Sequence, residues 1–343
     1  MIRKVSIPLV AGMIVAAGVG PSLPLVLCSV AASCVLLCLY ALRPGRPLAL
    51  PLLLFFCLGV FCRSSCSLVC ASACRIEPST MWLEKLVDAV PFAREETPAL
   101  AKALLAGRKE LLPAQTVRSF RAAGAAHILA LSGLHLGIIY ALVSKIFSLL
   151  GNSLPARRLR CALTIVLSLC YTLLTGAGPS LVRAFLFIAL YELGRLHPGR
   201  RTDSLSVFWT ALTVQLVLDP MVLDSVGFQL SYLAMLGIFT VYPVLREWYP
   251  ARRGLMWKIW NSAALSVSCQ LLTAPLVFAT FGTFPRYFLL TNLIALPLTS
   301  LFVTTTLCCT ALSTLGLCPA PLVRLVDLLS AALTGSLGII SRM

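Results

Sequence analysis

The stretch that decides the fold covers residues 286–316 and reads RYFLLTNLIALPLTSLFVTTTLCCTALSTLG. It holds one charged side chain, that of Arg286, and it exceeds the roughly 20 apolar residues that a helix needs to cross a bilayer. The stretch therefore predicts a transmembrane helix. Pro297 either kinks one long crossing or separates two shorter ones, and both interpretations stay open at this point.

Similar apolar runs fill most of the chain. Hydrophobic residues make up 59% of the sequence and charged residues only 12%, and the mean hydropathy is +0.94. A soluble domain carries about 25% charged residues, so the composition excludes a protein that folds mainly in water. We expect an all-α polytopic integral membrane protein with about ten to eleven transmembrane helices. The expected spans are residues 5–20, 22–42, 47–62, 125–150, 159–176, 179–196, 204–219, 226–245, 259–281, 286–316 and 319–340.

The positive charge is distributed unevenly among the loops. The net charge is +16, which favours either an anionic partner or the use of basic loops as topology signals. Loops 176–179, 219–225 and 282–285 contain no lysine or arginine, whereas the loops between them are basic. We therefore expect the basic loops on the cytoplasmic side, and the C-terminus outside if 286–316 crosses once.

Residues 63–121 differ from the rest, because they hold nine basic and six acidic residues. Trp82, Leu83, Leu86, Val87 and Val90 share one helical face, which is typical of an interfacial amphipathic helix. We thus expect N-terminal transmembrane helices in 1–62, an extracytoplasmic or interfacial segment in 63–121, and a transmembrane core in 122–343.

The chain contains 14 cysteines, and four of them recur every fourth residue. On a helix such residues form one stripe, whose neighbours are too far apart to form a disulfide with one another. Small buried apolar residues, disulfides to other segments and metal ligands all remain open, although the spacing is not that of a zinc finger. The four residues are Cys62, Cys66, Cys70 and Cys74.

Polar side chains lie in the middle or outer half of five expected spans, where burial in lipid is costly. This pattern predicts a polar cavity open to the outside. Glycine and proline break the same regions, at Ser132-Gly133 and at residues 175–180. Structural roles are the alternatives: a core histidine, an Arg183 ion pair with Asp219 or Asp224, an N-cap at Asp224, and amides that bond helices together. The polar residues are His135, Arg183, Asp219, Asp224, Gln229, Gln270 and Asn292.

Together these segments resemble the ComEC family of competence membrane channels. Four motifs follow the family's order: residues 123–137 (AGAAHILALSGLHLG); Thr175-Gly176 with Ser180 and Arg183-Ala184; residues 219–220 and 224–231; and residues 270–276 followed by 292–293 and 297–298. The resemblance implies that 122–343 is a competence-type channel core, which moves single-stranded DNA across the cytoplasmic (inner) membrane during natural transformation.

The resemblance also implies partners and a set of residues along the DNA path. It implies an extracytoplasmic DNA receptor and a cytoplasmic ATP-dependent motor. From the sequence itself we expect membrane lipid around the apolar spans, no cofactor, no enzymatic activity and no metal, because three scattered histidines are too few for a metal cluster. The sequence has no Walker A phosphate-binding loop, which agrees with a separate motor. The expected channel-lining residues are Ser132, His135, Arg183, Asp224, Gln229, Gln270 and Asn292.

The sequence departs from longer family members in two respects. Only residues 63–121 occupy the place of their OB-like domain, and the chain stops at Met343, before the place of a nuclease domain. We therefore expect no DNA capture by an OB-like surface, and we expect degradation of the other strand to happen elsewhere or not at all.

Two other functions fit parts of the pattern. A secondary transporter of a small anion would use the same broken helices and Arg183. An intramembrane hydrolase would use Ser132 as nucleophile and His135 as base, although the sequence offers no acid to orient the histidine.

Overall fold

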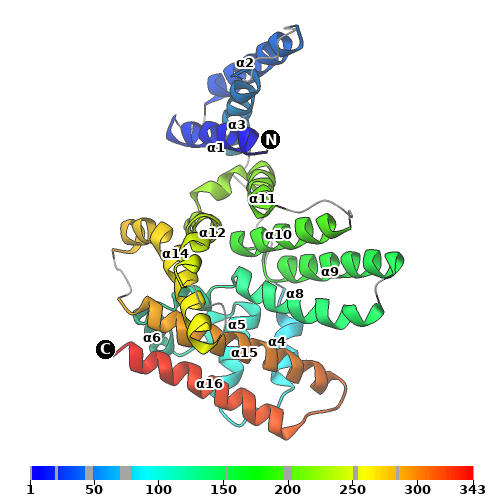
Figure 1. Ribbon diagram of the computed structural model, residues 1–343, viewed down its shortest axis with the longest axis vertical. Helices are drawn as coiled ribbons and strands as arrows, with labels where there is room; N and C mark the ends of the chain where they lie inside the picture. The colour runs from blue at the N-terminus through cyan, green and yellow to red at the C-terminus, as the bar shows by residue number, and fades with distance from the viewer. Residues whose placement is uncertain are drawn as a thin grey trace. The chain divides into compact units, whose positions relative to one another are not determined.

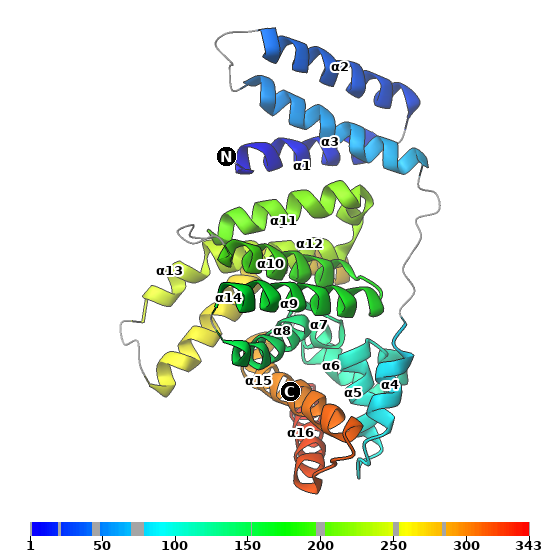
Figure 2. The ribbon, with the colours of Figure 1, turned by 90° about the vertical axis from the view of Figure 1, so that its right-hand side faces the viewer.

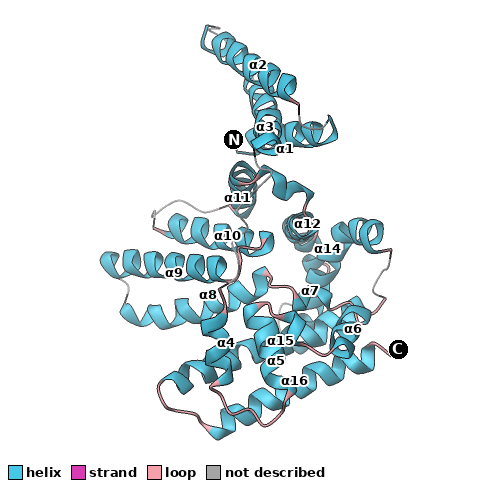
Figure 3. Ribbon diagram, turned by 180° about the vertical axis from the view of Figure 1, so that it is seen from behind, coloured by secondary structure: helices cyan, strands magenta, loops and turns pink. Residues whose placement is uncertain are grey.

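The structure, a computed structural model, describes residues 2–19, 22–42, 49–69, 79–151, 153–196, 203–249, 254–282 and 286–342. Every regular element within these ranges is a helix, which confirms the all-α expectation (Figure 3). The chain forms two compact units. The first unit comprises Met1–Arg75 and Ala189–Tyr232, and the second comprises Ile76–Ile188 and Leu233–Met343.

In the first unit, α1 (Ile2–Val19) and α2 (Leu23–Leu42) both pack against α3 (Ala49–Val69), as Figure 2 shows. The α1 and α3 backbones touch at two glycines. A Cβ on Gly12 would collide with the carbonyl of Phe56, and a Cβ on Gly59 with that of Leu9. Small residues of this kind allow close helix contact within membranes, where lipid and apolar side chains are equally good solvents.

The rest of the first unit comes from the middle of the chain. It contains α11 (Ser204–Leu218), the 3₁₀ helix η3 (Pro220–Asp224), the end of α10 (Pro179–Arg195) and the start of α12 (Val226–Thr240). α11 packs against α1, where the hydroxyls of Ser6 and Thr213 lie 2.6 Å apart. η3 contacts α3 and α11.

The second unit is built around two long adjacent helices, α15 (Phe288–Thr314) and α16 (Ala320–Ile340), which Figure 1 shows side by side. α15 is continuous and carries Pro297 inside it, so the alternative of two shorter crossings in 286–316 is wrong. The other helices are α4 (Met81–Asp88), α5 (Glu96–Ala106), η1 (Lys109–Leu111), α6 (Ala114–Ala122), α7 (Ala126–Leu129), α8 (Gly133–Phe147), η2 (Ser148–Leu150), α9 (Leu154–Leu174), α13 (Tyr242–Glu247) and α14 (Leu255–Phe281).

Helices of the segment 63–121 contribute to the core of the second unit. α4 and α5 contact α15, and α5 and α6 contact α16. Leu83, Val87 and Val90 are buried there, as the helical face predicted, but Trp82 of the same predicted face is 46% exposed. Trp82 lies one residue from Leu83, and therefore about 100° around the helix from it.

Four described helices are long and apolar enough to cross a membrane, namely those containing Ala49–Ser67, Leu255–Phe281, Phe288–Thr314 and Ala320–Ile340. Shorter apolar stretches of 10–17 described residues cover Lys4–Val19, Leu23–Leu36, Gly133–Phe147, Ser204–Leu218 and Val226–Thr240. The chain is thus an apolar, all-helical membrane protein, while the expected count of ten to eleven spans stays a prediction.

Candidate functional site

The first family-like motif folds as a broken helix. Gly124 has a φ of 79° and ends the turn that follows α6. The next helix, α7, is short, and the chain then runs extended through Ala130 to Ser132 before α8 begins. The predicted break at Ser132-Gly133 is therefore confirmed. Backbone groups at such a break lack helical partners and need side chains to satisfy them.

Ser132 and His135 form a capping box at this break. The Ser132 hydroxyl accepts from the backbone N–H of Leu134 at 3.3 Å, and His135 Nδ1 accepts from the backbone N–H of Ser132 at 3.2 Å. Because Nδ1 is an acceptor, the neutral ring carries its proton on Nε2. His135 is fully buried, and its Nε2 has no hydrogen-bond partner among the described residues.

Arg183 lies beside the start of α8. The turn from α9 to α10 is tight, with φ of 87° at Gly176 and 49° at Ala177, and it places Arg183 in the second turn of α10. Arg183 Nη2 is 3.2 Å from the position that a Cβ on Gly133 would occupy, so only glycine leaves this space free. Arg183 therefore brings α10 next to the start of α8.

Two buried amides come from α14 and α15. Gln270 Nε2 and Asn292 Oδ1 are shielded from solvent and have no hydrogen-bond partner within the described ranges. α15 contacts both α14 and α8, and the hydroxyl of Thr291 donates to the carbonyl of Ala123 at 2.7 Å, just before the broken helix. Five expected residues thus belong to neighbouring helices of the second unit: Ser132, His135, Arg183, Gln270 and Asn292.

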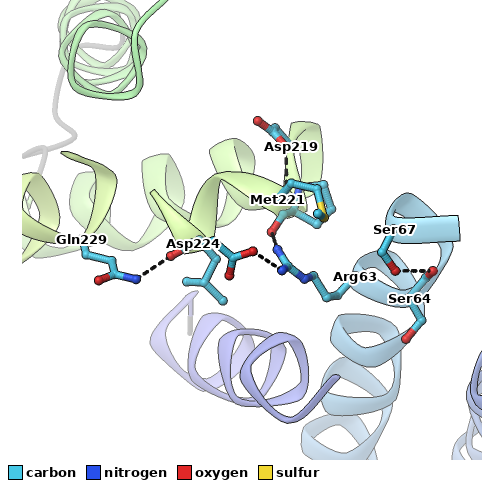
Figure 4. A network of polar contacts seen from close by, with 9 residues as sticks. Arg63, Ser64, Ser67, Asp219, Met221, Asp224 and Gln229 are labelled. Carbon is cyan, nitrogen blue, oxygen red and sulfur yellow. Dashed lines mark hydrogen bonds and ion pairs between the residues drawn. The ribbon is translucent and has the colours of Figure 1, made fainter. Parts of the chain in front are cut away.

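Asp224 and Gln229 lie in the first unit and have partners there (Figure 4). Asp224 forms an ion pair with Arg63 of α3, and Gln229 Nε2 donates to the carbonyl of Leu223 at 2.8 Å. The alternative that Asp224 caps the following helix is wrong, because the Ser225 hydroxyl accepts from Phe228 N at 3.4 Å at the start of α12.

Sequence reasoning gave Arg63 no role. The expected span 47–62 ends just before it. The helix instead continues to Val69 and buries the Arg63 side chain, which is only 8% exposed. The signal that was available is the residue type: an arginine on an apolar helix needs an acidic partner nearby.

The cysteine stripe contains two described residues, Cys62 and Cys66, which are half-buried on α3. Cys70 and Cys74 lie outside the described residues. Within the described ranges, no three His, Cys, Asp or Glu side chains come together as a metal site would require.

The sequence matches the family model described as "Competence protein" over residues 104–343. It is 26% identical over 203 residues to ComE operon protein 3 of Bacillus subtilis (strain 168), covering 59% of this chain and 25% of that protein. It is 24% identical over 200 residues to the uncharacterized protein YcaI of Escherichia coli (strain K12), covering 56% of this chain and 26% of YcaI.

A third similar protein is an uncharacterized protein of Aquifex aeolicus (strain VF5), which is 32% identical over 149 residues, covering 43% of this chain and 34% of that protein. The chain therefore spans about a quarter to a third of the length of these relatives. No solved structure gives a significant match.

Proposed function

Because this chain belongs to the competence protein family, we propose that its membrane core carries single-stranded DNA across the cytoplasmic membrane during natural transformation. Membership of the family itself suggests a role in DNA uptake. The parts that we propose are the passage of one strand, the location in the cytoplasmic membrane and the absence of a chemical step.

One observation supports passage of a polyanion more than any other. His135, Gln270 and Asn292 each carry one of the buried polar atoms that lack hydrogen-bond partners among the described residues, and Arg183 adjoins the start of α8, the helix of His135. Unpaired polar groups are costly in an apolar protein, so each needs an explanation, and a functional role is one such explanation. A phosphate backbone needs such groups, because it cannot cross hydrocarbon without polar or charged partners.

The partners follow from the same proposal. Because the sequence contains no Walker A phosphate-binding loop, the proposal assigns the pulling of the strand to a separate ATP-dependent motor on the cytoplasmic side. A receptor on the outer side presents the DNA, and lipid surrounds the apolar helices. Fixed polar contacts along the path stay weak and numerous, because tight binding at any one of them would stop the strand.

The direct test measures DNA uptake in cells that carry or lack the gene. DNA is labelled separately on each strand, and cytosolic label is distinguished from surface label by its resistance to external nuclease. We expect deletion to remove the cytosolic label and leave the surface label, and the restored gene to bring back the label of a single strand. Unchanged cytosolic label after deletion contradicts the proposal.

A small-anion transporter is the alternative that shares Arg183, and salt dependence separates the two. Binding of single-stranded DNA that neutralises several phosphates weakens steeply with salt, with a slope of about −0.7 per phosphate contact in a plot of log K against log salt. We expect the purified protein to bind a single-stranded oligonucleotide with such a slope. If the purified protein binds inorganic phosphate but does not bind the oligonucleotide, the result favours the transporter.

The hydrolase alternative predicts a different result for Ser132→Ala. The hydroxyl lies 3.3 Å from His135 Nδ1, but the other ring nitrogen has no described partner that could act as the orienting acid. We expect Ser132→Ala to lose only an N-cap, which costs about 1 kcal/mol, and to keep most DNA uptake.

The matched control for Ser132→Ala is Ser153→Ala, which removes the N-cap of α9, where the Ser153 hydroxyl accepts from Ala156 N at 3.4 Å. Both variants are compared at equal amounts of folded protein. Complete loss of uptake in Ser132→Ala alone would instead support a nucleophilic serine.

A further inference from the structure

Arg63 occupies an unusual position for a charged residue. It lies within the apolar stretch Ala49–Ser67 of α3, and its side chain is 8% exposed. Charged residues in such helices are rare, face the protein interior and pair with other polar groups. The partners of Arg63 therefore indicate the role of its charge.

The guanidinium binds both ends of η3 (Figure 4). Nη1 donates to the carbonyl of Pro220 at 2.7 Å, at the first residue of the 3₁₀ helix. Nη2 forms the ion pair with Asp224 Oδ2, at the last residue. The planar fork of arginine can make both contacts at once, whereas the ammonium group of a lysine is a compact point charge.

Contacts within the turn also hold η3 in place. The Asp219 carboxylate accepts from Met221 N at 3.0 Å before η3, and Gln229 of α12 donates to the carbonyl of Leu223 at 2.8 Å. These bonds join residues that are close in sequence, whereas Arg63 and Asp224 are separated by 161 positions. Arg63 thus fixes the turn relative to α3.

The two members of the ion pair differ in exposure. Arg63 is 8% exposed, but the Asp224 side chain is 58% exposed. A buried guanidinium with two contacts has little freedom to move, whereas the carboxylate that it holds remains accessible. The buried guanidinium therefore holds an accessible carboxylate in a fixed orientation.

We propose that Arg63 is a positioning residue for DNA translocation, which holds η3 so that Asp224 and Gln229 take the arrangement used by the passing strand. This inference rests on the proposed function. Arg63 lies outside the part of the chain that matches the family, residues 104–343, so the family match alone does not point to it.

The test is a double-mutant cycle of Arg63→Met, Asp224→Asn and the two together, read out both as DNA uptake per folded molecule and as the midpoint of thermal unfolding in detergent. We expect each single variant to lower uptake by roughly tenfold, equivalent to about 1.4 kcal/mol, and the double variant to lower it no further. Arg63→Lys restores part of the uptake, because it keeps the charge but not the fork.

Arg118→Met is the matched control, since Arg118 is exposed on α6 and its replacement removes the same charge from the chain. Wild-type uptake in Arg63→Met overturns this inference and leaves the proposed function intact. Losses that multiply in the double variant overturn it as well, because they show that Arg63 does not act through Asp224. A wild-type chain that supports no uptake overturns the proposed function together with this inference.

Discussion

Replacing Arg183 with alanine is expected to reduce cytosolic DNA uptake by about 10- to 1000-fold, the range over which a fixed charge in a low-dielectric site concentrates a charged ligand. Arg183 is on α10 and adjoins the start of α8 at Gly133. Surface-bound DNA should not change, because the proposed function assigns surface binding to a separate receptor. Arg183→Lys should retain more uptake than Arg183→Ala, since it keeps the positive charge.

The measurement is nuclease-resistant label per cell at equal amounts of folded protein. Arg324→Ala serves as the control, because Arg324 is exposed on α16 and its loss lowers the net charge equally. If Arg183→Ala retains half or more of wild-type uptake, Arg183 does not lie on the DNA path.

The second large effect is structural. Gly12→Leu is expected to destabilise the first unit by about 3 kcal/mol or more, because overpacking at a rigid contact forces the backbone to move. The added Cβ would meet the carbonyl of Phe56, and a carbonyl cannot rotate away as a flexible side chain can. Loss of the contact between α1 and α3 also disturbs the helix that carries Arg63, so DNA uptake should fall with stability.

The measurement is the midpoint of thermal unfolding in detergent, followed by tryptophan fluorescence, with the elution profile of the folded protein. Gly18→Leu is a control on the same helix, since a Cβ on Gly18 has no neighbour within 4 Å. Equal midpoints for the two variants would show that α1 does not approach α3 closely.

Local features of the fold could be predicted from the sequence. The expected helix positions follow the apolar runs, and the break at Ser132-Gly133 follows from the capping serine and the glycine. The expected run 226–245 is divided into α12 and α13, because Pro243 favours the start of a new helix. Breaks of this kind leave short apolar helices such as α8 and α12, which is why a count of apolar runs does not establish the number of spans.

Contacts between distant parts of the chain could not be predicted. For Asp224 the sequence leaves open an N-cap, an ion pair with Arg183 and a place on the DNA path, and it does not indicate the partner that the structure shows, Arg63. A sequence shows which side chains need partners, but the partner depends on how helices pack, and helix packing in lipid depends on small-residue contacts such as that of Gly59 with Leu9. Whether the candidate residues line a path for DNA remains a prediction.

The composition of the first unit has a consequence for how the protein is made. Its helices come from residues 1–75 and from residues 189–232, so α1 and α3 leave the ribosome long before α11 and η3 exist. Until then, the face of α1 that receives α11 and the guanidinium of Arg63 are without their native partners. Contacts between such distant segments form slowly, and until they form the exposed face of α1 can associate with non-native partners. Membrane insertion of α3 with its arginine is therefore the step at which a chaperone or a neighbouring helix has the most to contribute.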